Sequence, residues 1–213
     1  VARLRALELP VVIPHGLPGD AERTGFAVLR TDERNAFGSG LRYLQKFGHR
    51  RIASLLLELP LEESAKVRGF SSPELQEFYQ YNDIEGGDAL IAFVPNQANV
   101  MVHTVRKWLL GPQPPTAIMC HSDRVAMRVY QALKELNIRV PQQVSVVGYS
   151  NYPGSQLLLP PLTTIDIHFK DCGRMALDHL LEASKWYRPG LTPPEIFTPF
   201  ELIERGSVAS PHR

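Results

Sequence analysis

The chain has 213 residues, enough for one large domain or two small ones. Its 23 Lys and Arg residues almost balance its 22 Asp and Glu residues, and the net charge of +1 gives no electrostatic indication of a surface that wraps nucleic acid. We therefore expect that these residues alone do not bind DNA. The only cysteines, Cys120 and Cys172, lie in apolar patterns without metal-ligand spacing, which favours a reducing, cytoplasmic compartment.

The sequence gives no sign of a membrane or secretion segment. No apolar run has the length needed to cross a bilayer, and the opening residues VARLRALELPVV lack the pattern of a leader peptide. We expect a soluble chain whose first residues correspond to the middle of a domain.

Strands and helices alternate along the chain. Residues 9–15 and 26–32 are predicted strands on either side of a GLPGD turn, and apolar residues at helical spacing predict a helix over 33–48. This alternation predicts an α/β fold of parallel sheets built from βαβ units. The remaining predicted elements are strand 50–60, helix 66–81, strand 88–94, helix 97–110, strand 115–120, helix 122–137, strands 143–149 and 162–167, helix 169–186 and an edge strand in 197–207.

Three of these strands end in polar clusters. In an open parallel sheet, ligands bind beyond the carboxyl ends of the strands, where the positive ends of the following helices also converge. Taken singly, Asp32, Ser122 and Asp123 suit helix N-caps, but three clusters at equivalent strand ends favour a pocket. The clusters are Thr31-Asp32-Glu33, His121-Ser122-Asp123 and Tyr149-Ser150-Asn151.

The run PTAIMCHSDRVAMRVYQALKELNIRVPQQVSVVGYSN, followed by PPLTTIDIHFKDCGRMALDHLLE and FELIERGSV, resembles the effector-binding core of the LacI/GalR transcriptional regulators. Upstream, LPVVIPH, TDERNAFGSGLRYLQKFGHRRIASL and VRGF match the same family in the same order. The resemblance implies a type I periplasmic-binding-protein fold, with two doubly wound lobes, three crossovers between them and an effector in the cleft.

The resemblance also implies how the chain divides. We expect residues 1–48 and 168–190 to form an incomplete N-terminal lobe, and residues 49–167 and 191–213 to form the C-terminal lobe. In the family, a DNA-binding headpiece, a hinge helix and the first elements of the N-terminal lobe precede a segment like LRALELPVV. DNA binding would belong to such a headpiece, either of the usual helix-turn-helix type or of a winged type.

The family's effector positions map onto seven residues. Lys66 falls where relatives hold arginine, with Arg68 as a near alternative, and Ser150 falls where they commonly hold aspartate. Because this change removes a negative charge and keeps a positive one, it points to an anionic or acceptor-rich ligand such as a sugar acid. The alternative is that Asp32, Glu33 or Asp166 supplies the missing carboxylate. The candidate ligand-binding residues are Asp32, Glu33, Lys66, Asn96, Ser122, Ser150 and Phe169.

The resemblance predicts a homodimer as well. Family members dimerise partly through the segment GSQLLLPP and the helix that bears Met127. Leu157, Leu158 and Leu159 are consecutive in a short loop and cannot all turn inward, so at least one should lie in an exposed apolar patch. A contact that buries Leu158, with Met127 nearby, is the expected interface.

Two other functions are compatible with parts of the sequence. An enzyme would need a nucleophile and a base, but His121, Ser122 and Asp123 are adjacent on a strand-to-helix turn and should point in different directions. His49, His103, His168 and His179 have no metal spacing, and we expect solvent-facing positions for them. A periplasmic solute receptor shares the fold and is the remaining alternative. We expect no catalysis, no cofactor and no metal.

Overall fold

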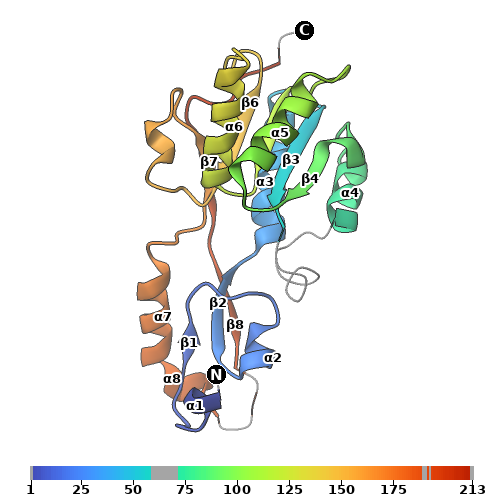
Figure 1. Cartoon of the computed structure of the whole chain (residues 1–213). Helices are drawn as coiled ribbons and strands as arrows, with labels where there is room; N and C mark the ends of the chain where they lie inside the picture. Colours follow the sequence, from blue (N-terminus) through green and yellow to red (C-terminus); the bar gives the residue numbers. More distant parts are fainter. Residues whose placement is uncertain (1, 59–71, 189–190, 192, 212–213) are drawn as a thin grey trace.

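The computed structural model describes residues 2–58, 72–188, 191 and 193–211, and its elements form two lobes around separate sheets (Figure 1). The small lobe contains α1 (Ala2–Arg5), β1 (Val12–Ile13), α2 (Asp20–Thr24), β2 (Ala27–Thr31), α7 (Cys172–Leu181), α8 (Ala183–Trp186) and β8 (Glu195–Thr198). The large lobe contains α3 (Glu33–Lys46), β3 (Ile52–Leu57), α4 (Ser72–Tyr81), η1 (Gly87–Leu90), β4 (Ile91–Val94), α5 (Ala98–Leu109), β5 (Ala117–Cys120), α6 (Asp123–Glu135), β6 (Ser145–Tyr149), η2 (Ser155–Leu157), β7 (Thr163–Asp166) and β9 (Glu201–Ile203).

The sheets confirm the predicted α/β class. The small sheet has three strands in the order β1-β2-β8, and the large sheet has six in the order β4-β3-β5-β6-β7-β9. All neighbouring strands are parallel except β9, which runs antiparallel to β7. Strand β3 pairs with β4 and β5 and not with β2, so it belongs to the second sheet, as predicted.

The chain passes between the lobes at three crossovers, as the family resemblance implies. The first joins β2 to α3, the second joins β7 to α7, and the third joins β8 to β9 (Figure 1). These crossovers bring residues that are far apart in the sequence to the junction of the lobes.

The predicted lobe boundaries need two corrections. Helix α3, assigned to the N-terminal lobe with residues 1–48, packs in the large lobe because Phe37, Leu41 and Leu44 are buried in its core. Strand β8, assigned to the C-terminal lobe with residues 191–213, pairs with β2 in the small sheet. The single edge strand predicted over 197–207 is therefore two strands in different sheets.

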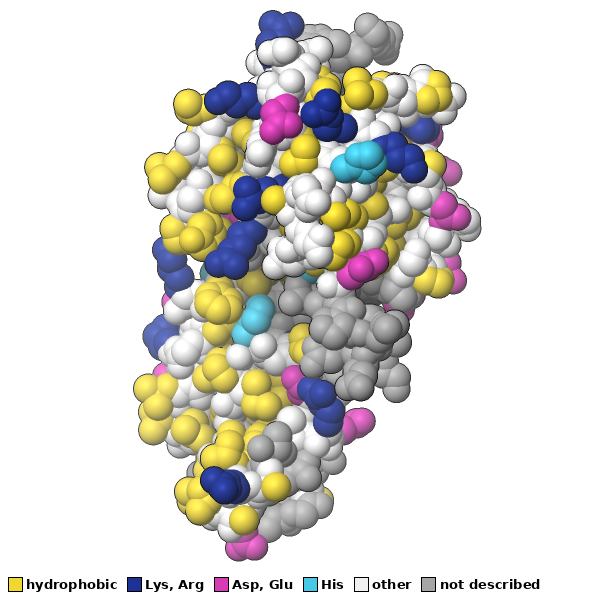
Figure 2. Space-filling model, viewed as in Figure 1, with side chains coloured by type: hydrophobic (Ala, Val, Ile, Leu, Met, Phe, Trp, Pro, Cys, Tyr) yellow, Lys and Arg dark blue, Asp and Glu magenta, His cyan; other side chains and the backbone are white. Residues whose placement is uncertain are grey.

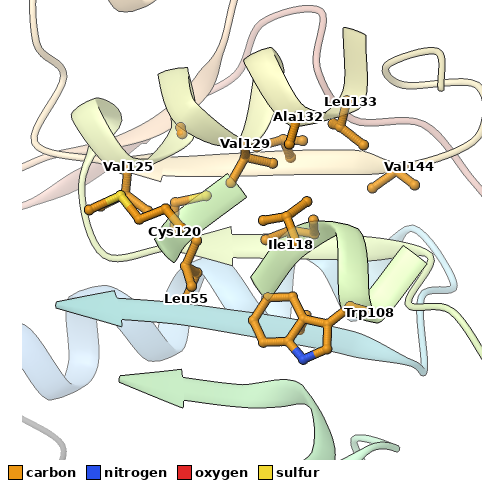
Figure 3. Close-up of a cluster of buried hydrophobic side chains, with 14 of the residues drawn as sticks. Leu55, Trp108, Ile118, Cys120, Val125, Val129, Ala132, Leu133 and Val144 are labelled. Carbon is orange, nitrogen blue, oxygen red and sulfur yellow. The ribbon is translucent and has the colours of Figure 1, made fainter. Parts of the chain in front are cut away.

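The large sheet is covered on both faces, which explains the uninterrupted apolar run of β3. Helices α5 and α6 cover one face: Val125, Val129 and Leu133 of α6 pack over Ile118 and its neighbours (Figure 3). Helices α3 and α4 contribute to a second buried cluster on the other face. The large sheet is therefore packed between two buried clusters.

Two helices differ from the prediction. The helix expected over 169–186 is divided into α7 and α8, and the described part of the helix expected over 66–81 begins at Ser72. In the part of the chain that the structure describes, no helix is long and apolar enough to cross a membrane.

The expectation of a solvent-facing His49 is wrong. Only 1% of this residue is exposed, because its ring lies between β5, β6 and the C-terminal tail. Its Nε2 donates to the carbonyl of Ala209 at 2.8 Å, and its Nδ1 lies 2.9 Å from the Thr116 hydroxyl. Burial lowers the pKa of His49 below its ordinary value. His103, by contrast, is exposed on α5.

Candidate functional site

A cavity of about 650 Å³ lies between the lobes. His15 and Leu17 of the small lobe line one side, and the ends of β5, β6 and β7 line the other. Glu33 from the first crossover and Phe169 from the second complete the wall. Figure 2 shows histidine and hydrophobic side chains gathered where the two lobes meet. A cavity of this size suits a small organic molecule.

The end of β6 shows how the sequence shapes this wall. Ser150 and Asn151 both have left-handed backbone conformations, with φ of 93° and 48°, so the chain turns sharply where the strand ends. The Ser150 amide donates to the carbonyl of Ile165 on β7 at 2.7 Å, which fixes the turn. Both residues line the cavity.

Beneath this turn lies a buried carboxylate. Asp123 is 0% exposed and accepts hydrogen bonds from the Thr164 hydroxyl at 2.6 Å and from the Tyr152 amide at 2.7 Å. Burial raises the pKa of Asp123 above its ordinary value, while these hydrogen bonds act in the opposite direction. A Cβ at Gly148 would lie 2.2 Å from Asp123 Oδ1, so glycine is required for the carboxylate to approach β6.

A hydrogen-bond chain connects the turn to the second crossover. Arg205 donates to the Asn151 side-chain oxygen at 2.7 Å, and Asn151 donates through Nδ2 to Asp166 at 2.7 Å. Asp166 also accepts from the His168 amide at 2.7 Å. The orientation of Asp166 at the cavity wall is thus fixed from two sides.

Four of the seven predicted ligand residues line the cavity. Three of them are Glu33, Ser122 and Ser150; the fourth, Phe169, is 59% exposed and makes an edge-to-face contact with His15. Ser122 is also the N-cap of α6, where its hydroxyl accepts from the Val125 amide. Ser122 therefore both caps the helix and lines the cavity.

Two of the other three predicted residues are described, and neither lines the cavity. Asp32 caps α3 by accepting from the Asn35 amide at 3.1 Å, in agreement with the helix N-cap that its sequence position suits. Asn96 is exposed before α5 and is not among the lining residues. Lys66 lies outside the described residues, as does its alternative Arg68.

The sequence did not single out the aromatic wall. Phe37 and Tyr149 line the cavity from α3 and β6, and Tyr152 follows on the next loop. Tyr149 belongs to one of the three polar clusters at the strand ends, whereas Phe37 lies only in the apolar pattern of the helix predicted over 33–48. These rings offer flat apolar surfaces to a ligand.

The cavity wall carries both signs of charge. Glu33, Asp166 and Asp171 contribute carboxylates, whereas Arg124 and Lys170 contribute cations. The guanidinium of Arg124 lies 5.6 Å from the centre of the Tyr152 ring. The wall can therefore accept hydrogen bonds from hydroxyl groups as well as donate them.

Within the His121-Ser122-Asp123 cluster, the side chains of Ser122 and Asp123 point to different partners. Ser122 Oγ is directed at the helix amide of Val125, whereas the Asp123 carboxylate is directed at Thr164 and Tyr152. This agrees with the expectation that adjacent residues on such a turn point apart.

The loop that follows β6 carries exposed leucines. Leu157 is 76% exposed and Leu159 is 89% exposed, so the prediction that at least one of the three leucines is exposed is confirmed. Leu158 differs, because it is partly buried against the core. A Cβ at Gly154 would lie 2.9 Å from Met127 Cε, which places this loop against α6.

Comparisons with known proteins point to one family. The profile of the periplasmic binding protein-like domain matches residues 41–208. The HTH-type transcriptional repressor PurR of Serratia proteamaculans is 33% identical over 181 residues, which cover 82% of this chain and 50% of the repressor. The chain thus spans about half the length of the curated relatives it matches.

Solved structures share the fold. A LacI family transcriptional regulator from Bifidobacterium animalis subsp. lactis superposes with a TM-score of 0.73 at 22% identity, covering 89% of this chain and 66% of that one. A LacI family regulator from Enterococcus faecium, solved with bound ribose, superposes with a TM-score of 0.68 at 21% identity, covering 87% and 66%.

Proposed function

Because the chain belongs to the periplasmic-binding-protein-like family, as an effector-binding core of the LacI/GalR type, we propose that it binds a small-molecule effector between its lobes. The observation that carries the proposal is the composition of the cavity wall, which combines residues of both lobes with residues of two crossovers. A ligand held by both lobes binds one relative arrangement of them better than another, and so shifts their equilibrium.

We further propose that the effector is a sugar or sugar derivative. Aromatic rings beside carboxylates and hydroxyls suit a molecule with apolar faces and many hydroxyl groups. The carboxylates of Glu33 and Asp166 lie on the wall, which supports the alternative in which they replace the aspartate that relatives hold at position 150. We therefore favour a neutral polyhydroxyl ligand over a sugar acid.

A thermal-shift panel tests this choice. Neutral sugars should raise the melting temperature of the chain, and Ser150→Asp should retain or improve their effect. If sugar acids alone stabilise the chain and Lys66→Ala weakens that stabilisation, the ligand is anionic and the charge argument from the sequence holds. If no sugar of either kind acts and free nucleobases do, the proposal of a sugar fails.

The wider role follows from the relatives. We propose a cytoplasmic homodimeric regulator whose DNA contact is made outside these 213 residues, rather than a periplasmic receptor, because the curated relatives are named transcriptional repressors. Mobility-shift assays with the complete gene product and its own upstream region test this. Specific binding that the effector modulates is expected, whereas a cleaved leader peptide on the gene product would contradict the proposal.

A further inference from the structure

Three metal-ligating side chains meet at the junction of the second and third crossovers. Asp166 ends β7, His168 follows two residues later, and Glu201 begins β9. One ligand atom from each of the three lies within 4.8 Å of the others. The cluster joins segments that are distant in the sequence, and for this reason residue spacing alone did not predict it.

The histidine ring lies between carboxylates without a close hydrogen bond to either. Its Nε2 is 3.9 Å from Glu201 Oε1, and its Nδ1 is 3.9 Å from Asp171 Oδ2. Both separations exceed a normal hydrogen bond. Two ligand atoms that share a tetrahedral ion at about 2.1 Å are about 3.4 Å apart. The Nε2–Glu201 separation exceeds this by about half an ångström, so the side chains must move closer together to hold an ion.

Two hydrogen bonds already fix the orientation of the Asp166 carboxylate. Asp166 receives one hydrogen bond on each oxygen, from Asn151 Nδ2 and from the His168 amide, and each oxygen keeps a further lone pair. Supporting hydrogen bonds of this kind commonly fix the ligands of a metal. His168 also has a left-handed backbone with φ of 51°, a conformation that is costly for a residue other than glycine.

The charge balance favours a cation as well. Among the described residues, His168 is the only basic side chain within 4.0 Å of a Glu201 carboxylate oxygen, and no Lys or Arg forms an ion pair with Asp166. Asp171 adds a third carboxylate, paired on its outer side with Arg174. The cluster therefore gathers negative charge at the point where two crossovers run together.

From this geometry we propose that Asp166, His168 and Glu201 bind a divalent transition-metal ion. One imidazole and two carboxylates suit Zn²⁺ or Mn²⁺ better than Mg²⁺, which prefers oxygen ligands and retains its waters. The ion would link the second crossover to the third. Because Asp166 and His168 also line the cavity, it would lie at the cavity wall.

Calorimetric titration of the untagged, chelator-treated chain with Zn²⁺ tests the site. We expect one ion per chain, with binding weakened at least about tenfold by Glu201→Gln and by His168→Ala, since each removes a ligand. His103→Ala and Glu85→Gln alter exposed residues of the same types elsewhere and should leave the affinity unchanged.

The two ligand variants, Glu201→Gln and His168→Ala, test the site independently of each other. The Glu201 side chain is 58% exposed, so Glu201→Gln should leave the fold intact even if His168→Ala does not. Zn²⁺ binding that is equal in wild type and Glu201→Gln, or absent from both, overturns the proposal. Because the titration contains no effector, a failure here is distinct from a failure of effector binding.

Discussion

The Thr164 hydroxyl donates a hydrogen bond to the wholly buried carboxylate of Asp123 at 2.6 Å. This contact ties the start of α6 to β7 directly beneath the cavity wall. A buried polar group that loses a partner costs about 1–3 kcal/mol, so Thr164→Val should lower the free energy of unfolding by that amount. Urea denaturation measures it.

Thr104→Val provides the control for that experiment. The Thr104 hydroxyl donates to the carbonyl of Val100 in its own helix and has no other hydrogen-bond partner among the residues that the structure describes, so its replacement should change the free energy of unfolding by less than about 0.5 kcal/mol. If both variants lose the same free energy of unfolding, the hydrogen bond to Asp123 stabilises the fold no more than a hydrogen bond within a helix.

Gly148 should not tolerate a side chain. Gly148→Ala would place a Cβ 2.2 Å from Asp123 Oδ1 and 2.7 Å from Leu162 Cδ2. We expect a loss of about 1–3 kcal/mol, the usual cost of overpacking a core. Gly173→Ala on α7 is the matched control, because nothing lies within 4 Å of the added atom. A thermal melt in which both variants match the wild type would contradict the packing described.

The buried His49 predicts a pH dependence of stability. Because its folded pKa is lowered, the unfolded chain binds a proton below about pH 6.5 while the folded chain does not. The free energy of unfolding should therefore fall as the pH decreases from 6.5 towards the folded pKa. His49→Gln should reduce this slope, as urea titrations at pH 7.5 and 5.5 would detect.

His103→Gln is the comparison for that slope. His103 is exposed on α5, and its replacement should leave the pH dependence as in the wild type. A slope that persists in His49→Gln and disappears in His103→Gln would assign the effect to the wrong histidine.

The exposed leucines predict the position of the dimer contact. Leu159 is the most exposed of the three, so Leu159→Asp should disrupt a dimer without disturbing the core. Light scattering at several protein concentrations measures the change in mass. Leu110→Asp, at a 69% exposed site at the end of α5, should leave the mass unchanged. A wild-type monomer, or a dimer insensitive to Leu159→Asp, would remove the proposed interface.

Local patterns predicted most of the large lobe. The apolar runs of β3 and β6 and the helical stripes of α3 and α6 agree with their predicted ranges because burial on a covered sheet dictates those patterns. The edge strand predicted over 197–207 is found as β9 at the edge of the large sheet, but the start of that range belongs to β8 in the small sheet, because which sheet a strand joins depends on distant partners. Strand β8 pairs with β2, more than 160 residues earlier, and no local pattern records that.

Local sequence patterns also predicted only part of the site. Ser122 and Ser150 follow predicted parallel strands, whose ends must converge, so position in the fold was sufficient to find them. Phe37 and His15 reach the cavity only through the packing of α3 and the crossing of the chain between lobes. The buried position of His49 likewise depends on the return of the tail to Ala209.

Calorimetric titration of the most stabilising sugar into the wild-type chain, Glu33→Gln and Asp32→Asn tests the central claim most directly. The two carboxylates are adjacent, but Glu33 lines the cavity whereas Asp32 caps α3, a role that asparagine also fills. We predict that Glu33→Gln weakens binding at least about tenfold, the loss of one charge-assisted hydrogen bond, while Asp32→Asn binds within about twofold of the wild type. Binding that is unaffected by Glu33→Gln, or lost in Asp32→Asn alone, would contradict an effector site between the lobes.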